Sequence, residues 1–259
     1  MTRLSKLSRS IAGKVAIVTG AASGMGRATA HLFADEGAHV AVTDINAEGV
    51  EAVVAEITEA GLSAKGWTLD LANLKRIKIV IAEVADNLGG IDILVNNAGI
   101  SKHTLIDDND YEEIWDRHLD ILLRAHTRTI RAALPHLRKS KGGRIVNIAS
   151  TEGLGATPET SPYTSAKHGV IGLTRSLAVE LGREGITVNC ICPGAIRTGM
   201  TQHIKEEHKT IFAKRRVPLR RYADPEEVAH GTLNFVLPAS SYMNGAVLPV
   251  DAGLTIKNA

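Results

Sequence analysis

The pair Tyr163 and Lys167 is the arrangement in this sequence best suited to proton transfer. The two residues lie four apart in Pro162–Gly182, a segment with helical periodicity, so they share one face a turn apart. A free tyrosine has a pKa of about 10, and a neighbouring ammonium lowers this pKa by favouring the phenolate. Such a phenol is a general acid/base for an alcohol or ketone oxygen. Taken alone, such a pair is far more often an ordinary pair on a solvated helix surface, so its meaning depends on the rest of the chain.

A glycine-rich turn, Thr19–Arg27, is the second stretch with a chemical meaning. It follows a strand-like apolar segment and leads directly into a helix-like one. Glycines there let the backbone approach a pyrophosphate, whose charge the helix N-terminus stabilises. A second strand-like segment ends at Asp44, about 20 residues after the turn, where a carboxylate can hold the ribose hydroxyls of adenosine. This order of elements predicts a dinucleotide site.

Strand-like and helix-like segments alternate along the chain, which predicts a parallel sheet with helices on both faces. Several of the strands are continuously apolar, as strands covered on both faces are. We therefore predict one α/β domain over residues 13–259, doubly wound and Rossmann-type, with a seven-stranded parallel sheet. The expected strands are Val15–Thr19, His39–Thr43, Ser63–Leu69, Ile91–Val95, Arg144–Ile148, Thr187–Ile191 and Ala246–Val250, and the expected helices are Gly24–Glu36, Ala47–Ala60, Leu74–Leu88, Tyr111–Lys139, Pro162–Gly182 and Pro225–Leu237.

Composition narrows the classes of partner. The 259 residues include 30 Lys and Arg against 28 Asp and Glu, and this balance gives no long-range reason to expect nucleic acid or a membrane surface. The apolar runs are strand-sized, far short of a membrane span. Two cysteines, Cys190 and Cys192, cannot complete a structural zinc site, so we expect no metal and assign them to packing in a reducing compartment, the cytoplasm.

The first residues of the chain are basic. Met1–Ser10 contains Arg3, Lys6 and Arg9 and no acid. This composition is faintly similar to a transit peptide but has no apolar signal-peptide region. We predict a flexible basic arm over residues 1–12.

The spacing of the glycines, together with five further motifs in order, resembles the short-chain dehydrogenase/reductase family. The resemblance covers roughly Lys14 to Gly253. Six motifs in the same order make chance a poor explanation. They are Thr19-Gly20-x-x-x-Gly24-x-Gly26, Asp70-Leu71, Asn96-Asn97-Ala98-Gly99, Ser150, Tyr163-x-x-x-Lys167 and Pro193-Gly194-Ala195-Ile196-Arg197-Thr198.

The resemblance implies a reaction and a set of site residues. Ser150 would hydrogen-bond the substrate oxygen, Tyr163 would move the proton, and Lys167 would lower the tyrosine pKa and bind the nicotinamide ribose. Hydride would pass between the substrate carbon and the nicotinamide ring. The implied cofactor contacts are Gly20, Ser23, Gly24, Met25, Gly26, Asp44, Ile45, Asp70, Leu71, Asn97, Ala98, Gly99, Tyr163, Lys167, Pro193, Gly194, Ile196 and Thr198.

The cofactor is predicted to be NAD. A carboxylate at Asp44 bonds a ribose 2′-hydroxyl but repels a 2′-phosphate. The neighbouring positions Ser23 and Ile45 supply no basic group that could offset this repulsion. The resemblance further implies a homotetramer, because family members associate through the two long helices, whose apolar positions here occupy more than one face, and through the last strand.

One position departs from the family pattern. The family's asparagine, which helps to hold a water-linked proton relay to the lysine, corresponds to Leu122, seven residues after Trp115. His118 and His126 lie one turn before and one turn after Leu122. They are candidates to replace the relay, although histidines on such a helix are more often interface or solvated residues.

The substrate side is less defined by the sequence. The residues expected to shape the pocket and a lid at about 199–217 are Ser101, Lys102, His103, Glu152, Leu154 and the polar segment Thr201–Arg216, which reads equally well as a solvated loop. We expect a small-molecule secondary alcohol or ketone as substrate. Two alternatives remain open at this point: a 3-oxoacyl thioester reductase, and a non-catalytic dinucleotide sensor, which only Leu122 supports.

Overall fold

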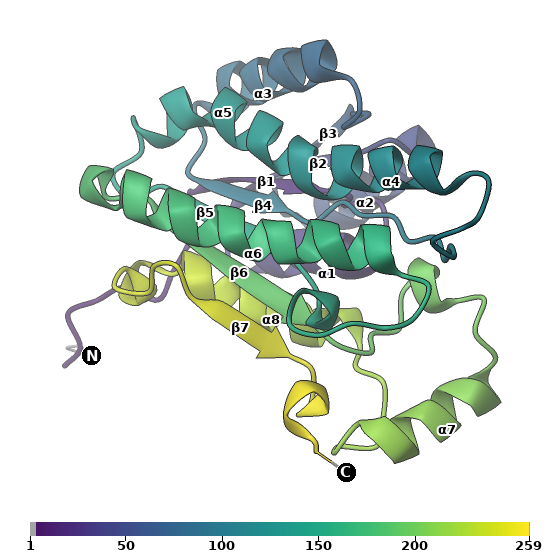
Figure 1. Cartoon of the computed structure of the whole chain (residues 1–259). Helices are drawn as coiled ribbons and strands as arrows, with labels where there is room; N and C mark the ends of the chain where they lie inside the picture. Colours follow the sequence, from purple (N-terminus) through teal and green to yellow (C-terminus); the bar gives the residue numbers. More distant parts are fainter. Residues whose placement is uncertain (1–3, 259) are drawn as a thin grey trace.

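A single parallel sheet organises the molecule. The structure, a computed structural model, describes residues 4–258, and its strands are ordered β3-β2-β1-β4-β5-β6-β7 with every neighbouring pair parallel (Figure 1). The predicted fold class is confirmed, and each predicted strand is present with ends shifted by no more than two residues. The strands are β1 Val15–Thr19, β2 His39–Asp44, β3 Ala64–Thr68, β4 Ile93–Asn96, β5 Arg144–Ile148, β6 Thr187–Pro193 and β7 Val247–Val250.

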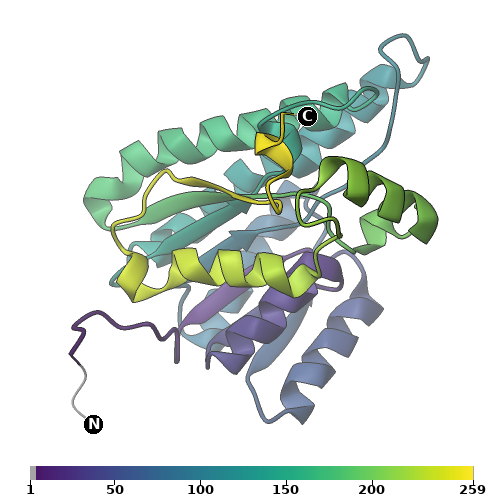
Figure 2. The ribbon, with the colours of Figure 1, turned by 90° about the horizontal axis from the view of Figure 1, so that it is seen from below.

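Helices cover both faces of the sheet. Figure 2 shows the face on which α1 and α8 pack together with α2 beside α1; α3, α5, α4 and α6 cover the other face, with α3 against α5 and α4 against α6. None of the helices in residues 4–258 combines the length and the apolar character that crossing a membrane requires. The helices are α1 Gly24–Asp35, α2 Ala47–Glu59, α3 Leu74–Leu88, α4 Tyr111–Leu119, α5 Ala125–Leu137, α6 Ser161–Leu181, α7 Glu206–Arg216 and α8 Pro225–Val236.

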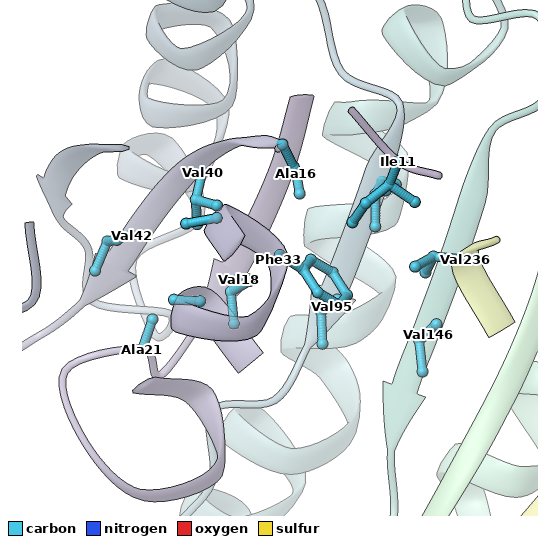
Figure 3. Packing of buried hydrophobic residues seen from close by; sticks show 14 of the residues in the cluster. Ile11, Ala16, Val18, Ala21, Phe33, Val40, Val42, Val95, Val146 and Val236 are labelled. Carbon is cyan, nitrogen blue, oxygen red and sulfur yellow. The ribbon is translucent and has the colours of Figure 1, made fainter. Parts of the chain in front are cut away.

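Each face of the sheet has its own apolar core, because alternate residues of a strand point to opposite faces. On the side of α1 and α8, Phe33 is fully buried among side chains that include Val18 and Val95 (Figure 3). On the opposite side, Ile17 and Leu94 pack with residues of α3 and α5. The sheet is thereby held from both sides, and the carboxyl ends of its strands are fixed relative to one another.

The predicted N-terminal arm is docked over much of its described part. Ile11 is fully buried in the core beneath α1. The backbone N–H of Ala239 donates to the carbonyl of Ser8, and that of Gly13 donates to the carbonyl of Gly37. From Ser8 onward the segment therefore packs on the domain, which a free arm would not do. The prediction for Met1–Arg3 lies outside the described residues.

The helix predicted over Tyr111–Lys139 is not one regular α-helix. It consists of α4, a π-helical segment over Asp120–Arg124, and α5, which ends at Leu137. A π turn holds one more residue than an α turn, so it changes which side chains face the sheet from that point on. The prediction of one regular helix was wrong at the segment that contains Leu122.

The predicted lid segment contains a helix that hydropathy alone did not indicate. Residues Gly199–Thr201 form a 3₁₀ turn, and α7 follows. Buried residues Ala213, Val217 and Tyr222 form a small apolar cluster of their own beneath α7. The placement of charges could have predicted this helix. Acidic residues occupy the first turn of α7 and basic residues its last turn, as the helix dipole favours.

Candidate active site

The site lies where the carboxyl ends of the central strands meet, the usual binding edge of an open parallel sheet. A cleft of about 260 Å³ opens there, and a cavity of about 160 Å³ adjoins it at the end of β2. The cleft is lined by Gly20, Ser23, Gly24, Met25, Asp44, Asn97, Ala98, Gly99, Ile148, Ala149, Tyr163, Lys167, Thr198, Gly199 and Met200. The cavity is lined by Thr19, Gly20, Thr43, Asp44, Ile45, Leu69, Asp70, Leu71, Ala98, Gly99, Ile100, Arg117 and Ile121.

The glycine-rich turn is packed so closely that side chains are excluded. Gly20 has a φ of +65°, and a Cβ there would lie 2.6 Å from the Cα of Ala98. A Cβ on Gly26 would overlap the carbonyl oxygen of Gly20. The side-chain amide of Asn97 donates to the carbonyls of Thr19 and Gly20 at 2.9 and 3.1 Å. The turn is thus fixed with its backbone open to the cleft, as close approach of a phosphate requires.

The carboxylate of Asp44 is fixed at the end of β2. It accepts hydrogen bonds from the backbone N–H groups of Ala22 and Asn46 at 3.1 and 3.0 Å. Polar Asp44 and Asp70 together with apolar Ile45 and Leu71 border the adjoining cavity. This donor and acceptor set fits an adenosine, with a ribose at the carboxylate and a base between apolar side chains.

Among the residues of this cavity that escaped the sequence analysis are two from the helical segment after β4. Arg117 of α4 and Ile121 of the π segment border the cavity. No local motif marks them, because their position depends on how α4 and the π segment pack against α6. Their distance in sequence from every glycine and strand-end motif hid them.

The three predicted catalytic residues are brought together. Ser150 follows β5, and its Oγ accepts from the backbone N–H of Glu152 at 3.1 Å. Tyr163 and Lys167 come from the first two turns of α6. The Lys167 Nζ donates to the carbonyl of Ile148 at 2.8 Å and lies 5.5 Å from the centroid of the Tyr163 ring. The phenol and the ammonium thus line the cleft, and the Ser150 hydroxyl contacts the phenol.

The prediction that Lys167 lowers the tyrosine pKa is wrong for this structure. Burial raises the pKa of Tyr163 to about 12, and the contact with Ser150 offsets only part of that effect. Burial likewise lowers the pKa of Lys167 to about 8. The ammonium is bonded to the carbonyl of Ile148 rather than directed at the phenol oxygen, which explains why it does not offset the burial of Tyr163. Tyr163 is therefore a protonated donor at neutral pH.

His118 is fully engaged in local bonds. Its Nδ1 lies 2.7 Å from the carbonyl of Ile114, and its Nε2 accepts from the backbone N–H of Lys102 at 3.2 Å. Its ring meets the Tyr163 ring edge-on, with centroids 6.4 Å apart. Burial lowers its pKa. His118 therefore holds the loop at Lys102 against α4 and packs beside the phenol, with neither nitrogen available for a relay.

Glu152 sets the charge on the substrate side of Tyr163. Its carboxylate accepts from the backbone N–H and the hydroxyl of Thr157 at 2.8 and 2.7 Å, and from the hydroxyl of Thr164 at 3.0 Å. Its negative charge acts to raise the pKa of Tyr163. Leu154 nearby in sequence is exposed. The substrate side of Tyr163 therefore has a fixed carboxylate, that of Glu152, and an exposed apolar side chain, that of Leu154.

The other predicted substrate-side residues lie on the loop after β4. Lys102 pairs with Asp110 at 2.7 Å, and His103 lies 4.0 Å from Glu159. Ser101 is exposed. Lys102 is therefore tied to its own loop, and His103 lies beside the loop before α6.

Not every predicted cofactor contact lines the cleft or its cavity. A Cβ on Gly194 would lie 2.8 Å from the Cα of Asp251, which marks a close backbone crossing. Ile196 is buried and bridges to Ala223. Pro193 ends β6 and is buried as well. These residues support the loop that carries Thr198, which does line the cleft.

Comparisons with known proteins agree with this geometry. A family model described as enoyl-(acyl carrier protein) reductase matches residues 20–255. A (2S)-[(R)-hydroxy(phenyl)methyl]succinyl-CoA dehydrogenase subunit of Thauera aromatica is 39% identical over 95% of this chain and 98% of its own. A 3-oxoacyl-[acyl-carrier-protein] reductase of Thermotoga maritima is 38% identical over 94% and 98%. A crystal structure from Beutenbergia cavernae, described as an NAD(P)-dependent gluconate 5-dehydrogenase with NADP at low occupancy, superposes with a TM-score of 0.90 at 35% identity, covering 96% and 100%.

Proposed function

The chain belongs to the short-chain dehydrogenase/reductase family of oxidoreductases, and from that premise we propose that it transfers a hydride between NAD and a secondary alcohol or ketone. One observation carries the proposal. Tyr163 and Lys167 line a cleft that the glycine-rich turn also lines, and Ser150, from a separate part of the chain, contacts the phenol of Tyr163. A nucleotide and a carbonyl oxygen can therefore be held side by side.

Ser150, Tyr163 and Lys167 have different roles near the substrate oxygen. The bound nicotinamide supplies the hydride donor or acceptor. The Ser150 hydroxyl donates to the substrate oxygen, and the protonated phenol of Tyr163 delivers a proton to that oxygen during ketone reduction. In alcohol oxidation the same phenol oxygen takes the proton back. The Lys167 ammonium, 5.5 Å from the centroid of the Tyr163 ring, would bind the nicotinamide ribose beside the phenol.

The preference for NAD is argued from Asp44. Its carboxylate is fixed by two backbone N–H groups and cannot swing out of the cavity without breaking both bonds. A 2′-phosphate would meet this charge, whereas a 2′-hydroxyl would donate to it. Arg117 borders the same cavity but is exposed, which weakens its pull on a phosphate. The Beutenbergia neighbour holds NADP, so the cofactor needs direct measurement.

A 3-oxoacyl thioester reductase is the second candidate, favoured by the Thermotoga maritima relative. The two functions differ in substrate and cofactor. A 3-oxoacyl thioester reductase would prefer the phosphorylated cofactor and would turn over acyl carrier substrates. The fixed charges of Asp44 and Glu152 at the two ends of the site favour the first, since both oppose an additional phosphate nearby.

We assign the chain to a homotetramer in the cytoplasm. The strand β7 is at the edge of the sheet, and Val179 on the outer side of α6 is 85% exposed. Tyr242, before β7, is fully exposed. Apolar side chains beside an open strand edge favour association with further copies. Light scattering at micromolar concentration is expected to give the mass of a tetramer, and a monomer would contradict the assignment.

Steady-state kinetics test the proposed function. The wild-type enzyme is offered secondary alcohols, the matching ketones and a 3-oxoacyl thioester, each with both cofactors. We expect the larger kcat/KM with NAD on an alcohol or ketone. A ratio favouring NADP with the thioester would support the reductase instead. The Asp44→Asn variant is the matched control, and it should reduce the preference for NAD because it removes the repelling charge.

A further inference from the structure

The short turn that follows Ser150 contains a residue with two different contacts, Glu152. This turn, Thr151–Gly153, is a 3₁₀ turn after β5, with Ser150 as its N-cap. The backbone N–H of Glu152 donates to the Ser150 Oγ at 3.1 Å, which holds the hydroxyl oxygen as an acceptor and leaves its proton free for another partner. Glu152 therefore fixes the Ser150 oxygen through its backbone, and its carboxylate is available for contacts elsewhere.

The carboxylate of Glu152 contacts the first turn of α6. Its Oε2 accepts from the hydroxyl of Thr164 at 3.0 Å, and the hydroxyl of Thr160, the N-cap of α6, lies 3.5 Å from the same oxygen. Thr164 directly follows Tyr163 in the chain. Hydrogen bonds to a charged carboxylate are shorter and stronger than those between neutral groups. The carboxylate is therefore a direct link from the turn after Ser150 to the helical turn that carries Tyr163.

Gly153 brings the same turn against the next turn of α6. A Cβ on Gly153 would lie 2.9 Å from the carbonyl oxygen of Lys167, so a side chain there would keep the two backbones apart. Thr164 and Lys167 are three residues apart and are therefore neighbours on one face of the helix. The turn thus meets α6 at two adjacent points, by close packing at Lys167 and through the carboxylate of Glu152 at Thr164.

The same carboxylate also holds the loop between this turn and α6. It accepts from the backbone N–H of Thr157 at 2.8 Å and from the hydroxyl of Thr157 at 2.7 Å. The carbonyl of Glu159, later in the loop, accepts from the backbone N–H of Thr104 at 2.9 Å, which bonds the loop to the chain after β4. The carboxylate of Glu152 therefore has partners on the loop and partners on α6, and the two kinds of contact can be removed separately.

We propose that Glu152 is a positioning residue, which holds the hydroxyls of Ser150 and Tyr163 at the separation that one shared substrate oxygen requires. Its backbone bonds the Ser150 oxygen, and its carboxylate bonds Thr164, the neighbour of Tyr163. Ser150 and Tyr163 come from different segments, so helix periodicity does not set their separation. A displacement of about 1 Å in reacting groups can cost about 100-fold in rate. The catalytic consequence rests on the proposed function, in which both hydroxyls bond the substrate oxygen.

Removal of the carboxylate tests the effect on turnover. Glu152→Ala deletes the side-chain contacts and keeps the backbone bond to Ser150, so we expect kcat to fall about tenfold while the Kd of NAD is unchanged. Glu152→Gln keeps an acceptor and should restore most of kcat. The solvent deuterium isotope effect on kcat should be larger in Glu152→Ala, because a displaced phenol transfers its proton more slowly. An isotope effect equal to that of wild type would overturn the positioning role even if kcat fell, since loss of folded enzyme alone lowers kcat without changing it.

Two matched substitutions test the contact with α6. Thr164→Val and Thr157→Val each remove one hydroxyl that donates to the same carboxylate, but only Thr164 lies on α6. Thr164→Val should therefore lower kcat more than Thr157→Val does. Adding Thr164→Val to Glu152→Ala should cause little further decrease, because contacts within one network are not additive. Equal effects of the two valine variants, or a double variant in which the two decreases multiply, would overturn the proposal.

Crystal structures separate this proposal from the proposed function, because they need no turnover. The distance between the Ser150 Oγ and the Tyr163 Oη is measured in the wild type, Glu152→Ala and Glu152→Gln. We expect Glu152→Ala to lengthen it by about 1 Å and Glu152→Gln to keep the wild-type value. An unchanged distance in Glu152→Ala would overturn the proposal. A wild type that turns over no alcohol or ketone would instead defeat the proposed function, and this distance would still decide the positioning role. If Glu152→Ala does not fold, the same distance in Thr164→Val decides it.

Discussion

The two helical segments that flank the site differ in regularity. Helix α6 runs without interruption through 21 residues and presents Tyr163 and Lys167 on one face, as spacing by four requires. The facing segment changes from α4 to a π turn at Asp120–Arg124 and then to α5. One helix therefore places its functional side chains by periodicity alone, and the other places them by a local irregularity.

The irregular segment gives its two histidines different surroundings. His118, before the π turn, is bonded to Ile114 and Lys102 and touches the ring of Tyr163. His126, after it, is buried, and its Nε2 has no hydrogen-bond partner among the described residues. The comparison teaches that a π turn can bury polar side chains that a regular helix would place elsewhere.

The largest effect is expected on the regular helix. Tyr163→Phe removes the proton-transfer hydroxyl and leaves the cleft intact, so turnover should fall by about 100- to 10,000-fold while NAD binding is retained. Calorimetric titration with NAD and initial rates measure the two quantities. The matched control is Tyr111→Phe, which loses a hydroxyl bonded to Ser161 of α6 at 2.9 Å, outside the cleft. A Tyr163→Phe rate close to wild type would show that this hydroxyl is not the acid/base.

Removing the charge of Glu152, beside α6, is expected to have a smaller effect than Tyr163→Phe. Because the carboxylate of Glu152 raises the pKa of Tyr163, Glu152→Gln should lower it. Alcohol oxidation uses the deprotonated phenol, so the acidic limb of its kcat/KM profile should move to lower pH. The control Glu159→Gln removes an exposed charge from the same loop region that does not act on Tyr163. Identical shifts in both variants would refute a specific effect of Glu152.

A still smaller effect is expected at the centre of the irregular segment. Leu122→Asn places an amide where the family has its asparagine. We expect kcat to be unchanged or raised, because Ser150 and Tyr163 already act locally on the substrate oxygen. A large decrease would mean that the apolar side chain of Leu122 is itself required there. An inactive wild type, with activity gained only in Leu122→Asn, would favour the dinucleotide sensor.

The last expected effect concerns stability and not turnover. The folded-state pKa of His126, about 3, lies below its unfolded value of about 6.5, so the unfolded chain takes up the proton first as the pH falls. The stability that the neutral ring contributes is complete above about pH 6.5 and is lost progressively toward pH 3. Chemical denaturation at pH 7 and pH 5 should show this loss, and in His126→Leu it should be smaller by about 2 kcal/mol. An equal loss in both proteins would contradict the pKa of His126.

Much of this architecture followed from local pattern. Continuous apolar strands predicted the doubly wound sheet, and strand-end motifs predicted which loops meet, because parallel strands bring their carboxyl ends to one edge. Helix α8 begins at a capping box that Asp224 and Glu227 form. The spacing of Tyr163 and Lys167 gave their shared helix face but not the burial that governs their pKa values.

The features that could not be predicted from the sequence depend on tertiary packing. No periodicity in Tyr111–Lys139 distinguishes a π turn from an α turn, so the environments of Leu122 and His126 were not predictable. Arg117 borders the adenosine cavity because of how α4 packs against α6. The docking of Ile11 similarly needs the core beneath α1, which no short motif near the N-terminus reports.

Transfer of deuterium tests the central claim most directly. A secondary alcohol carrying deuterium on its carbinol carbon is incubated with NAD and the wild-type enzyme, and the reduced cofactor is examined by mass spectrometry. We predict that the reduced nicotinamide carries the deuterium, and that Tyr163→Phe forms far less of it in the same time. Tight NAD binding with no labelled product from any alcohol in the panel would contradict the claim that this chain is a hydride-transferring enzyme.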